Sequence, residues 1–376
     1  MDVQSDRGLV LYFMDLPDPR GENAIHILTD MFVIAICAVI CGADCWVDVQ
    51  LFGIAKKAFF KTFLRLPGGI PSHDTFSRVF SRIDPDEFEK CFNAWVTSLA
   101  QSNGKLIAID GKSIRRSFEH GWDKSGMTHL INAFVAENQM IFAQLATDKT
   151  SNEITAIPKL LELLDLRDAT VTIDAIACQK NIAQAISDKQ AHYILALKGN
   201  QPDLHSQVQS ALDEAIASGF SNMPHDYHEQ TNGGHGRLES RQTWITTDIA
   251  WLGERLKEWP SLAALMVVKA TRTLNGKTSV SHRYYISSNA KMTAKQAAEA
   301  IRGHWKIENQ VHWILDVAFN EDQRRMRKDH GAENFSRLGR IALNLLKTEK
   351  TKKVGIKAKR KLAGWDHSYL LTLLLK

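Results

Sequence analysis

The stretch Leu106-Ile107-Ala108-Ile109-Asp110 decides the fold class, because a short apolar run that ends in an acid is typical of a buried strand. Two further apolar runs, 129–135 and 140–146, are separated by a tight polar link and predict a hairpin. After them a helix (154–166), a strand (169–173), a helix (179–189) and a strand (193–197) alternate. Three strands followed by alternating helices and strands predict an α/β domain with a mixed sheet and flanking helices.

The first 100 residues have a different, helical pattern. The apolar run 31–41 has 11 residues, whereas a membrane span needs about 20, so we expect a buried helix and no membrane contact. The break at 67–71 precedes Ser72 and Asp74, either of which would cap a helix that continues to Ile83. With a second helix over 85–99, residues 1–100 are predicted to form an all-α domain.

Residues 101–345 are predicted to form the α/β domain, interrupted by a strand-rich insertion at about 201–280. Strands are expected at 244–246, 265–270 and 284–287, and Thr293 is predicted to cap a helix that continues past Trp313. The remaining residues, 346–376, are predicted to be a basic C-terminal tail.

Positive charge lies in the later part of the chain. Residues 1–100 hold 9 basic and 13 acidic residues and therefore have a net charge of −4. Because the whole chain has a net charge of +5, residues 101–376 have a net charge of +9. The segment 347–361 alone holds eight basic residues and one acidic residue, which predicts contact with a polyanion backbone; a solvated tail is the alternative. The residues of this segment that are expected to contact the polyanion are Lys352, Lys353, Lys359, Arg360 and Lys361. The chain has five cysteines, an odd number, and we see no export signal in it. These two observations predict reduced thiols in a cytoplasm.

Two acids stand at the ends of expected strands. Asp110 follows Ile109, and Asp174 follows Ile173. If the two strands lie side by side, both carboxylates reach the same sheet edge, where a hard cation such as Mg²⁺ would offset their repulsion. The alternative is that each acid only caps a turn.

A third acid, Glu308, lies in the block His304-Trp305-Lys306-Ile307-Glu308-Asn309-Gln310-Val311-His312-Trp313. On a helix His304, Glu308 and His312 share one face, which we expect to be partly buried. The alternative for Glu308 is an ion-paired structural carboxylate. Three acids downstream are its rivals: Asp316, Glu321 and Asp322.

These motifs, in this order and spacing, resemble those of the H-repeat-associated proteins and related bacterial insertion-sequence transposases of the DDE class, which have a ribonuclease-H-like core. The similarity covers nearly the whole chain, and residues 1–90 or so resemble the helical domain that accompanies these transposases. The matching stretches are Ile107-Ala108-Ile109-Asp110-Gly111-Lys112, Asn152-Glu153-Ile154-Thr155-Ala156-Ile157-Pro158, Thr172-Ile173-Asp174-Ala175, Leu197-Lys198-Gly199-Asn200-Gln201 and the block 304–313.

The resemblance implies that Asp110, Asp174 and Glu308 are the catalytic acids and hold two Mg²⁺ ions, with Mn²⁺ as the alternative metal. It implies cleavage of double-stranded DNA at terminal inverted repeats and strand transfer to target DNA, by a homodimer at least when on DNA. The expected location is the bacterial cytoplasm, in association with the nucleoid.

One departure from the family concerns its cationic helpers. Many relatives have Tyr, Arg and Lys where this chain has Ile301, His304 and Leu315. We therefore expect Lys306, Arg302 or the two histidines, His304 and His312, to supply DNA contacts. Four other cations are expected at phosphates, with solvated surface as the alternative: Lys112, Arg115, Arg116 and Lys198.

Two other functions stay open at this point. The first alternative is a DNA-binding relative of a transposase that has lost catalysis. The second is a repeat-associated accessory protein that needs neither metal nor DNA. The complete set of three acids favours the enzyme over the first alternative. A gel shift with DNA would separate the enzyme from the second alternative.

Overall fold

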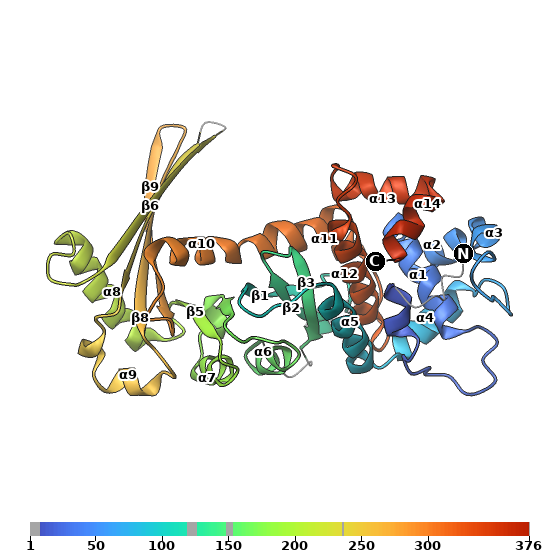
Figure 1. The fold of residues 1–376 in the computed structure, drawn as a ribbon, viewed down its shortest axis with the longest axis horizontal. Helices are drawn as coiled ribbons and strands as arrows, with labels where there is room; N and C mark the ends of the chain where they lie inside the picture. The colour runs from blue at the N-terminus through green and yellow to red at the C-terminus, as the bar shows by residue number, and fades with distance from the viewer. Residues whose placement is uncertain (1–7, 119–125, 148–152, 235–236, 376) are drawn as a thin grey trace.

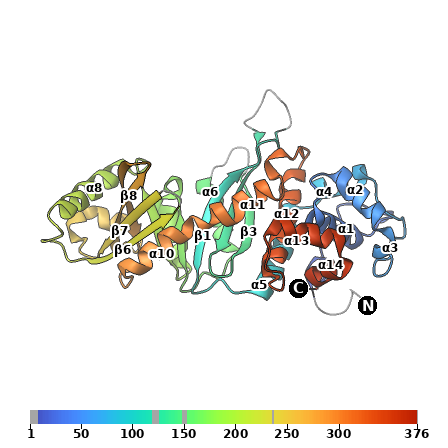
Figure 2. The same cartoon turned by 90° about the horizontal axis from the view of Figure 1, so that it is seen from above.

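The computed structural model describes residues 8–118, 126–147, 153–234 and 237–375. The molecule is elongated (Figure 1), with the sheet between a helical region that holds both ends of the chain and a long β-arm. The view from above keeps the same three parts in line (Figure 2).

The described residues form one mixed sheet of nine strands in the order β3-β2-β1-β4-β5-β9-β8-β7-β6. The strands are β1 (Leu106–Ser113), β2 (His129–Val135), β3 (Met140–Ala146), β4 (Thr170–Ile173), β5 (His192–Leu197), β6 (Asp226–Gly234), β7 (Arg237–Thr246), β8 (Ala264–Leu274) and β9 (Lys277–Ser287). β4 and β5 run parallel to β1, whereas β2 runs antiparallel to both β1 and β3. The prediction of an α/β protein with a mixed sheet is therefore confirmed.

Helices cover both faces of this sheet. The helices between and after the strands are α6 (Glu153–Glu162), α7 (Lys180–Asp188), α8 (Pro202–Ala217), α9 (Glu254–Glu258), α10 (Ala294–His304) and α11 (Trp313–Val317), with 3-10 turns η3 (Ala175–Ala177), η4 (Ala250–Leu252) and η6 (Glu321–Gln323). α10 crosses one face over β1 and β4, while α6 and α7 lie on the other side (Figure 1). Ile107, Ala108 and Ile109 are fully buried between these layers, as expected for a strand without polar alternation.

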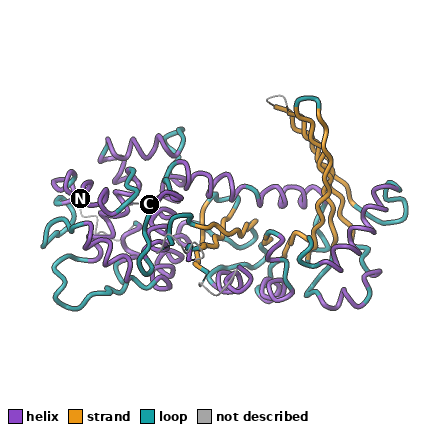
Figure 3. Tube along the Cα trace, turned by 180° about the vertical axis from the view of Figure 1, so that it is seen from behind, coloured by secondary structure: helices purple, strands orange, loops and turns teal. Residues whose placement is uncertain are grey.

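The predicted insertion is continuous with the sheet. β9 pairs antiparallel with β5, from Ile194↔Ser287 to Leu197↔Tyr284, and carries β8, β7 and β6 with it. These four strands extend as a twisted arm well beyond the helices (Figure 3). The sequence indicated only parts of β7, β8 and β9, because the apolar pattern stops where the strands leave the core: the first five residues of β8 are buried and its later ones are not.

The helical region combines the two ends of the chain. Its elements are η1 (Leu9–Phe13), α1 (Leu28–Cys41), α2 (Trp46–Ala55), α3 (Lys57–Phe60), α4 (His73–Arg82), α5 (Pro85–Leu99), α12 (Gly331–Thr348), α13 (Ile356–Trp365) and α14 (His367–Leu374). Of the two caps predicted for α4, Ser72 is the one used: its Oγ accepts from the Thr75 backbone N–H. α1 packs against α12 and α13, so much of the segment predicted as a basic C-terminal tail, 346–376, is helical and packs on the helical region. The basic segment is followed by apolar residues such as Leu370 and Leu373, which are buried. Their burial explains why the basic segment is held in the fold.

Within the described residues, no single helix combines the length and the hydropathy of a membrane span; α1 and α2 meet that test only as a pair bent by 99°.

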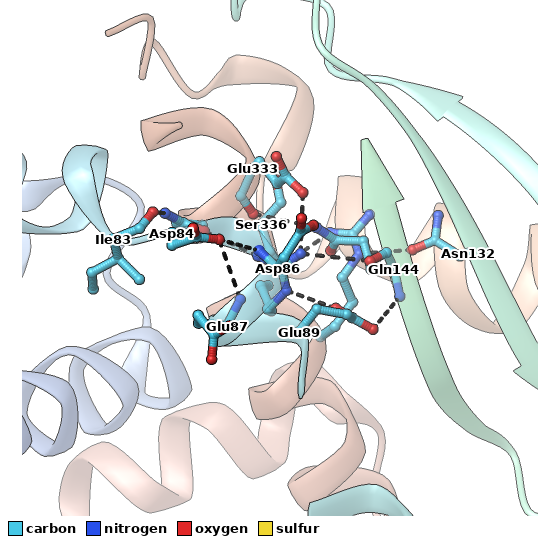
Figure 4. Close-up of polar contacts among 12 residues, drawn as sticks. Ile83, Asp84, Asp86, Glu87, Glu89, Asn132, Gln144, Glu333 and Ser336 are labelled. Carbon is cyan, nitrogen blue, oxygen red and sulfur yellow. Dashed lines mark hydrogen bonds and ion pairs between the residues drawn. The ribbon is translucent and has the colours of Figure 1, made fainter. Parts of the chain in front are cut away.

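A buried polar network joins the helical region to the sheet (Figure 4). Arg337 of α12 donates from Nε to Glu89 Oε2 of α5 (2.8 Å), and Glu89 Oε1 accepts from the Gln144 backbone N–H of β3 (2.8 Å). One turn later, Arg340 pairs with Glu321 and donates to Asn132 Oδ1 of β2 (2.9 Å). Buried charges are tolerated when they are paired in this way, and the network fixes α12 against β2 and β3.

Candidate metal centre

The parallel register of β1 and β4 brings the two predicted aspartates to one sheet edge. The last paired residues are Ile109 and Ile173, so Asp110 and Asp174 follow side by side. Asp174 ends its strand as predicted and caps η3, accepting from the Ala175 backbone N–H at 2.6 Å. Asp110 lies inside its strand, because β1 continues beside β2 as far as Ser113.

Glu308 reaches the same edge from the helix that crosses the sheet. Between α10 and α11 the helix widens into a π-turn, η5 (Glu308–His312). Single π-turns inside α-helices are frequently found at functional sites. Among the described residues, ligand atoms of Asp110, Glu308 and His312 lie within 4.8 Å of one another, and Asp174 stands outside that group.

The electrostatics of this group suit a cation. Burial, and then the negative charge of Glu308, raise the pKa of Asp110 to about 7. Burial, and then the nearby cations Arg340 and Lys112, lower the pKa of His312 to about 3, so its imidazole is neutral. His312 Nδ1 lies 3.5 Å from Asp110 Oδ2, and its Nε2 is buried without a hydrogen-bond partner in the described part of the chain. A neutral imidazole and two close carboxylates form a donor set for a divalent metal ion.

Glu153 is a residue of this site that the sequence reasoning did not single out. Its Oε1 lies 2.7 Å from His129 Nε2, whose Nδ1 in turn lies 2.9 Å from Ser113 Oγ. A Cβ at position 111 would collide with the Glu153 carboxylate, so Gly111 allows the acid to approach β1 beside Asp110. The signal was present in the family motif that begins at Asn152, which lies outside the described residues.

Lys112 has a structural role and is not the exposed phosphate contact that was predicted. Its side chain is 8% exposed, and its Nζ lies 2.6 Å from Asp316 Oδ1 and 3.3 Å from Asp322 Oδ1. Two of the three downstream acids considered as rivals of Glu308, Asp316 and Asp322, are thus partners of Lys112, and the third, Glu321, pairs with Arg340. Arg115 also reaches Asp322 (3.0 Å) but remains exposed, as does Arg116.

The remaining predicted cations near the site divide by burial. Lys198 is exposed, with Nζ 3.5 Å from Asp174 Oδ1, and Lys306 is exposed on the helix. His304 faces inward, with Nδ1 3.2 Å from Thr172 Oγ1, and burial lowers its pKa. Burial lowers the pKa of both His304 and His312, which disfavours charged contacts from these two imidazoles to DNA.

The C-terminal cations divide in the same way. Lys359 and Arg360 are 5% and 6% exposed. Lys359 Nζ donates to the Leu346 carbonyl (2.9 Å) and to that of Glu349, and Arg360 Nη2 donates to the Val39 carbonyl (2.8 Å). These two residues hold helices together and cannot contact DNA without unfolding that packing. Three cations of the predicted set remain exposed: Lys352, Lys353 and Lys361.

An open cavity of about 680 Å³ adjoins the site on the side of Asp174. Its lining includes Lys198, Arg283, His304 and Trp305. The Arg283 guanidinium lies 5.4 Å from the Trp305 ring centroid. The cavity therefore combines positive charge and an aromatic surface next to the acids.

Comparison with known proteins shows the family of this chain. Residues 101–345 match the model of the family described as "Transposase DDE domain". The chain belongs to the transposase DDE domain family. Residues 10–96 match a second family model, described as "DDE_Tnp_1-associated".

Members of this DDE family from Escherichia coli are similar over nearly their whole length. "Putative transposase YncI" of strain O157:H7 is 41% identical, covering 98% of this chain and 94% of that protein. "H repeat-associated putative transposase YhhI" of strain K12 is 39% identical, covering 96% and 95%. A solved piggyBac transposase synaptic complex with hairpin DNA matches with a TM-score of 0.43 at 9% identity, covering 99% of this chain and 82% of that one.

Proposed function

We propose that this DDE-family protein is an active transposase that cleaves DNA at the terminal inverted repeats of its element and joins the ends to target DNA, with Mg²⁺ as the metal. The observation that carries the proposal is the group of Asp110, Glu308 and His312, whose ligand atoms lie within 4.8 Å of one another. Asp174 follows the neighbouring strand and completes the acidic set. The strand order β3-β2-β1-β4-β5, with β2 antiparallel, supports a ribonuclease-H-like core.

The donor set fits the metal that the family implies. Asp110 and Glu308 supply hard oxygen ligands, and the close approach of these like charges favours a cation between them. Bound divalent ions would activate the attacking oxygen and stabilise the leaving oxygen of the phosphodiester. In this proposal Asp110, Asp174 and Glu308 would hold the ions.

The other residues of the site position these acids. Lys112 ties β1 to Asp316 on α11 and so fixes the helix that carries Glu308. His312 faces both Asp110 and Glu308 from the π-turn. Lys198, Arg115 and Arg116 are exposed nearby and would neutralise backbone phosphates on the two sides of the acids.

The test uses linear DNA that carries the inverted repeats of the element. Wild-type protein with Mg²⁺ is expected to nick the repeat ends, and Ca²⁺ is expected to support binding without cleavage. Asp110→Asn and Glu308→Gln should each abolish nicking while leaving the gel shift unchanged. Exposed Asp74→Asn on α4 is a matched control that should cleave normally. Equal nicking by wild type and Asp110→Asn would overturn the proposed site.

A further inference from the structure

Helix α2 is apolar on almost every side. Only two of its ten residues, Asp48 and Gln50, are polar. Its buried residues are Trp46, Val49 and Gly53, and the helix packs against α1 and α4. Because a helix that is apolar all round is usually covered on all sides, we expect the outer side of α2 to be covered as well.

Four apolar residues form this outer side. Val47 is 46% exposed, Leu51 59% and Ile54 53%, and Ala55 is exposed beside them. On a helix these four positions lie within an arc of about 100°, so they make one continuous stripe. Exposed apolar residues that are scattered singly are ordinary, whereas a stripe of them indicates a surface that binds a partner. We call these four residues the α2 face.

The α2 face is separate from the candidate metal centre. α2 lies in the helical region, at the opposite end of the molecule from the β-arm (Figures 1 and 2), whereas Asp110 and Asp174 lie on the sheet between these two parts. The four residues of the α2 face carry no charge, so they offer nothing to the phosphates that dominate contacts with DNA. Its partner is therefore an apolar protein surface.

The charges at the two ends of α2 point to a second copy of the same helix. Asp44 and Asp48 lie at its N-terminal end, and the exposed Lys57 and Lys61 follow its C-terminal end. In an antiparallel pair about a two-fold axis, the acidic end of each α2 lies beside the basic end of the other, whereas a parallel pair would bring like charges together. Leu51, in the middle of the α2 face, then packs beside its own copy.

We propose that two copies of this chain associate through their α2 faces, packed antiparallel, in the absence of DNA. The proposal goes beyond the transposase function and does not depend on it, because the contact needs neither DNA nor metal. One helix face is smaller than the roughly 800 Å² per partner of a standard interface. The dimer is therefore weak, with a Kd on the order of micromolar.

Sedimentation equilibrium of the full chain without DNA, from about 1 to 100 µM, brackets this Kd. The wild-type mass should rise with concentration from one chain toward two. Leu51→Glu would place two like charges together at the two-fold axis and should weaken association roughly 10-fold or more. Leu51→Lys should do the same. Because Leu51 is exposed, both variants should unfold in urea as wild type does.

Mixing the two variants tests the two-fold pairing directly. An equimolar mixture of Leu51→Glu and Leu51→Lys should associate more strongly than either variant alone, because opposite charges then meet at the axis. Leu238→Glu, at a leucine that is 55% exposed on the β-arm, is the matched control and should associate as wild type does.

Three results would overturn the proposal. They are a wild-type protein that stays monomeric over the whole range, Leu51 variants that associate as wild type does, and a mixture that associates no better than the single variants. Nicking of the repeat ends in Mg²⁺ is scored separately, so the transposase proposal can stand while this one fails, and the reverse.

Discussion

His312 Nδ1 lies 3.5 Å from Asp110 Oδ2, so a neutral imidazole and a buried carboxyl face each other where the π-turn crosses β1. This contact makes His312 a candidate metal ligand, although the sequence pointed only to the three acids. Mn²⁺ accepts both carboxylate and imidazole ligands and is a convenient reporter ion.

His312→Ala is expected to weaken Mn²⁺ binding at least roughly 10-fold, the scale on which even groups that only support metal ligands act. The free ion can be measured by electron paramagnetic resonance of the DNA-free protein. His73→Ala, an exposed histidine of α4, should bind Mn²⁺ as wild type does. If His312→Ala also keeps the wild-type affinity, then His312 only packs against the acids.

Gly111→Ala tests the approach of Glu153 to β1. The added Cβ would push the Glu153 carboxylate and the His129 ring apart from their 2.7 Å contact. Overpacking of this kind costs about 1–3 kcal/mol of unfolding free energy, which urea titration can measure. Gly21→Ala, where nothing lies within 4 Å, should be nearly neutral.

The double variant Gly111→Ala, Glu153→Ala sharpens this test. Removing the carboxylate relieves the collision, so the two substitutions should be less destabilising together than the sum of each alone. Strict additivity would show that residues 111 and 153 do not meet.

Much of the sheet was predictable because its signal is local. The hairpin strands 129–135 and 140–146 and the helix 85–99 have the bounds expected from their apolar patterns. The prediction that Asp110 and Asp174 lie at the same sheet edge followed from one assumption, that the two strands lie side by side, and the register confirms that assumption.

The features that were not predicted depend on contacts between distant segments. Charge density predicted that Lys359 and Arg360 contact DNA, yet backbone carbonyls of α12 and α1 accept from them inside the fold. Lys112 looked like a phosphate ligand until its partners, 204 and 210 residues away, were known. The π-turn at Glu308 was not predicted, because the sequence analysis assumed one regular helix from Thr293 past Trp313.

Lys347 gives the protein a specific pH dependence of stability. Burial lowers its pKa from 10.5 to about 7, and its Nζ, 5.0 Å from the Phe134 ring centroid, has no hydrogen-bond partner within the described residues. Between pH 7 and 10.5 the unfolded chain holds a proton that the folded chain has released, so stability rises with pH there. The slope from this group is about 1.4 kcal/mol per pH unit.

Lys347→Met should therefore stabilise the protein at pH 7 and remove that part of the rise. Urea unfolding of both proteins at pH 7, 8 and 9 measures the difference, which should shrink as the pH increases. A difference that is constant over this range would mean that Lys347 is not held neutral in the fold.

The exposed C-terminal cations allow the predicted DNA contact to be tested apart from folding. Replacing Lys352, Lys353 and Lys361 by Ala removes three exposed charges, and if each meets a phosphate, the slope of log affinity against log salt should become shallower by roughly 2 to 3. Filter binding from 50 to 300 mM salt would give this slope, with unfolding curves that match wild type. Lys359→Met is the contrasting change: it removes the cation beside Glu349 and the donor to two carbonyls, although Thr351 and Tyr369 still donate to Glu349, and it should cost roughly 2–4 kcal/mol of stability. An unchanged salt slope in the triple variant would exclude these three lysines from the DNA interface, because each lysine that contacts a phosphate contributes to that slope.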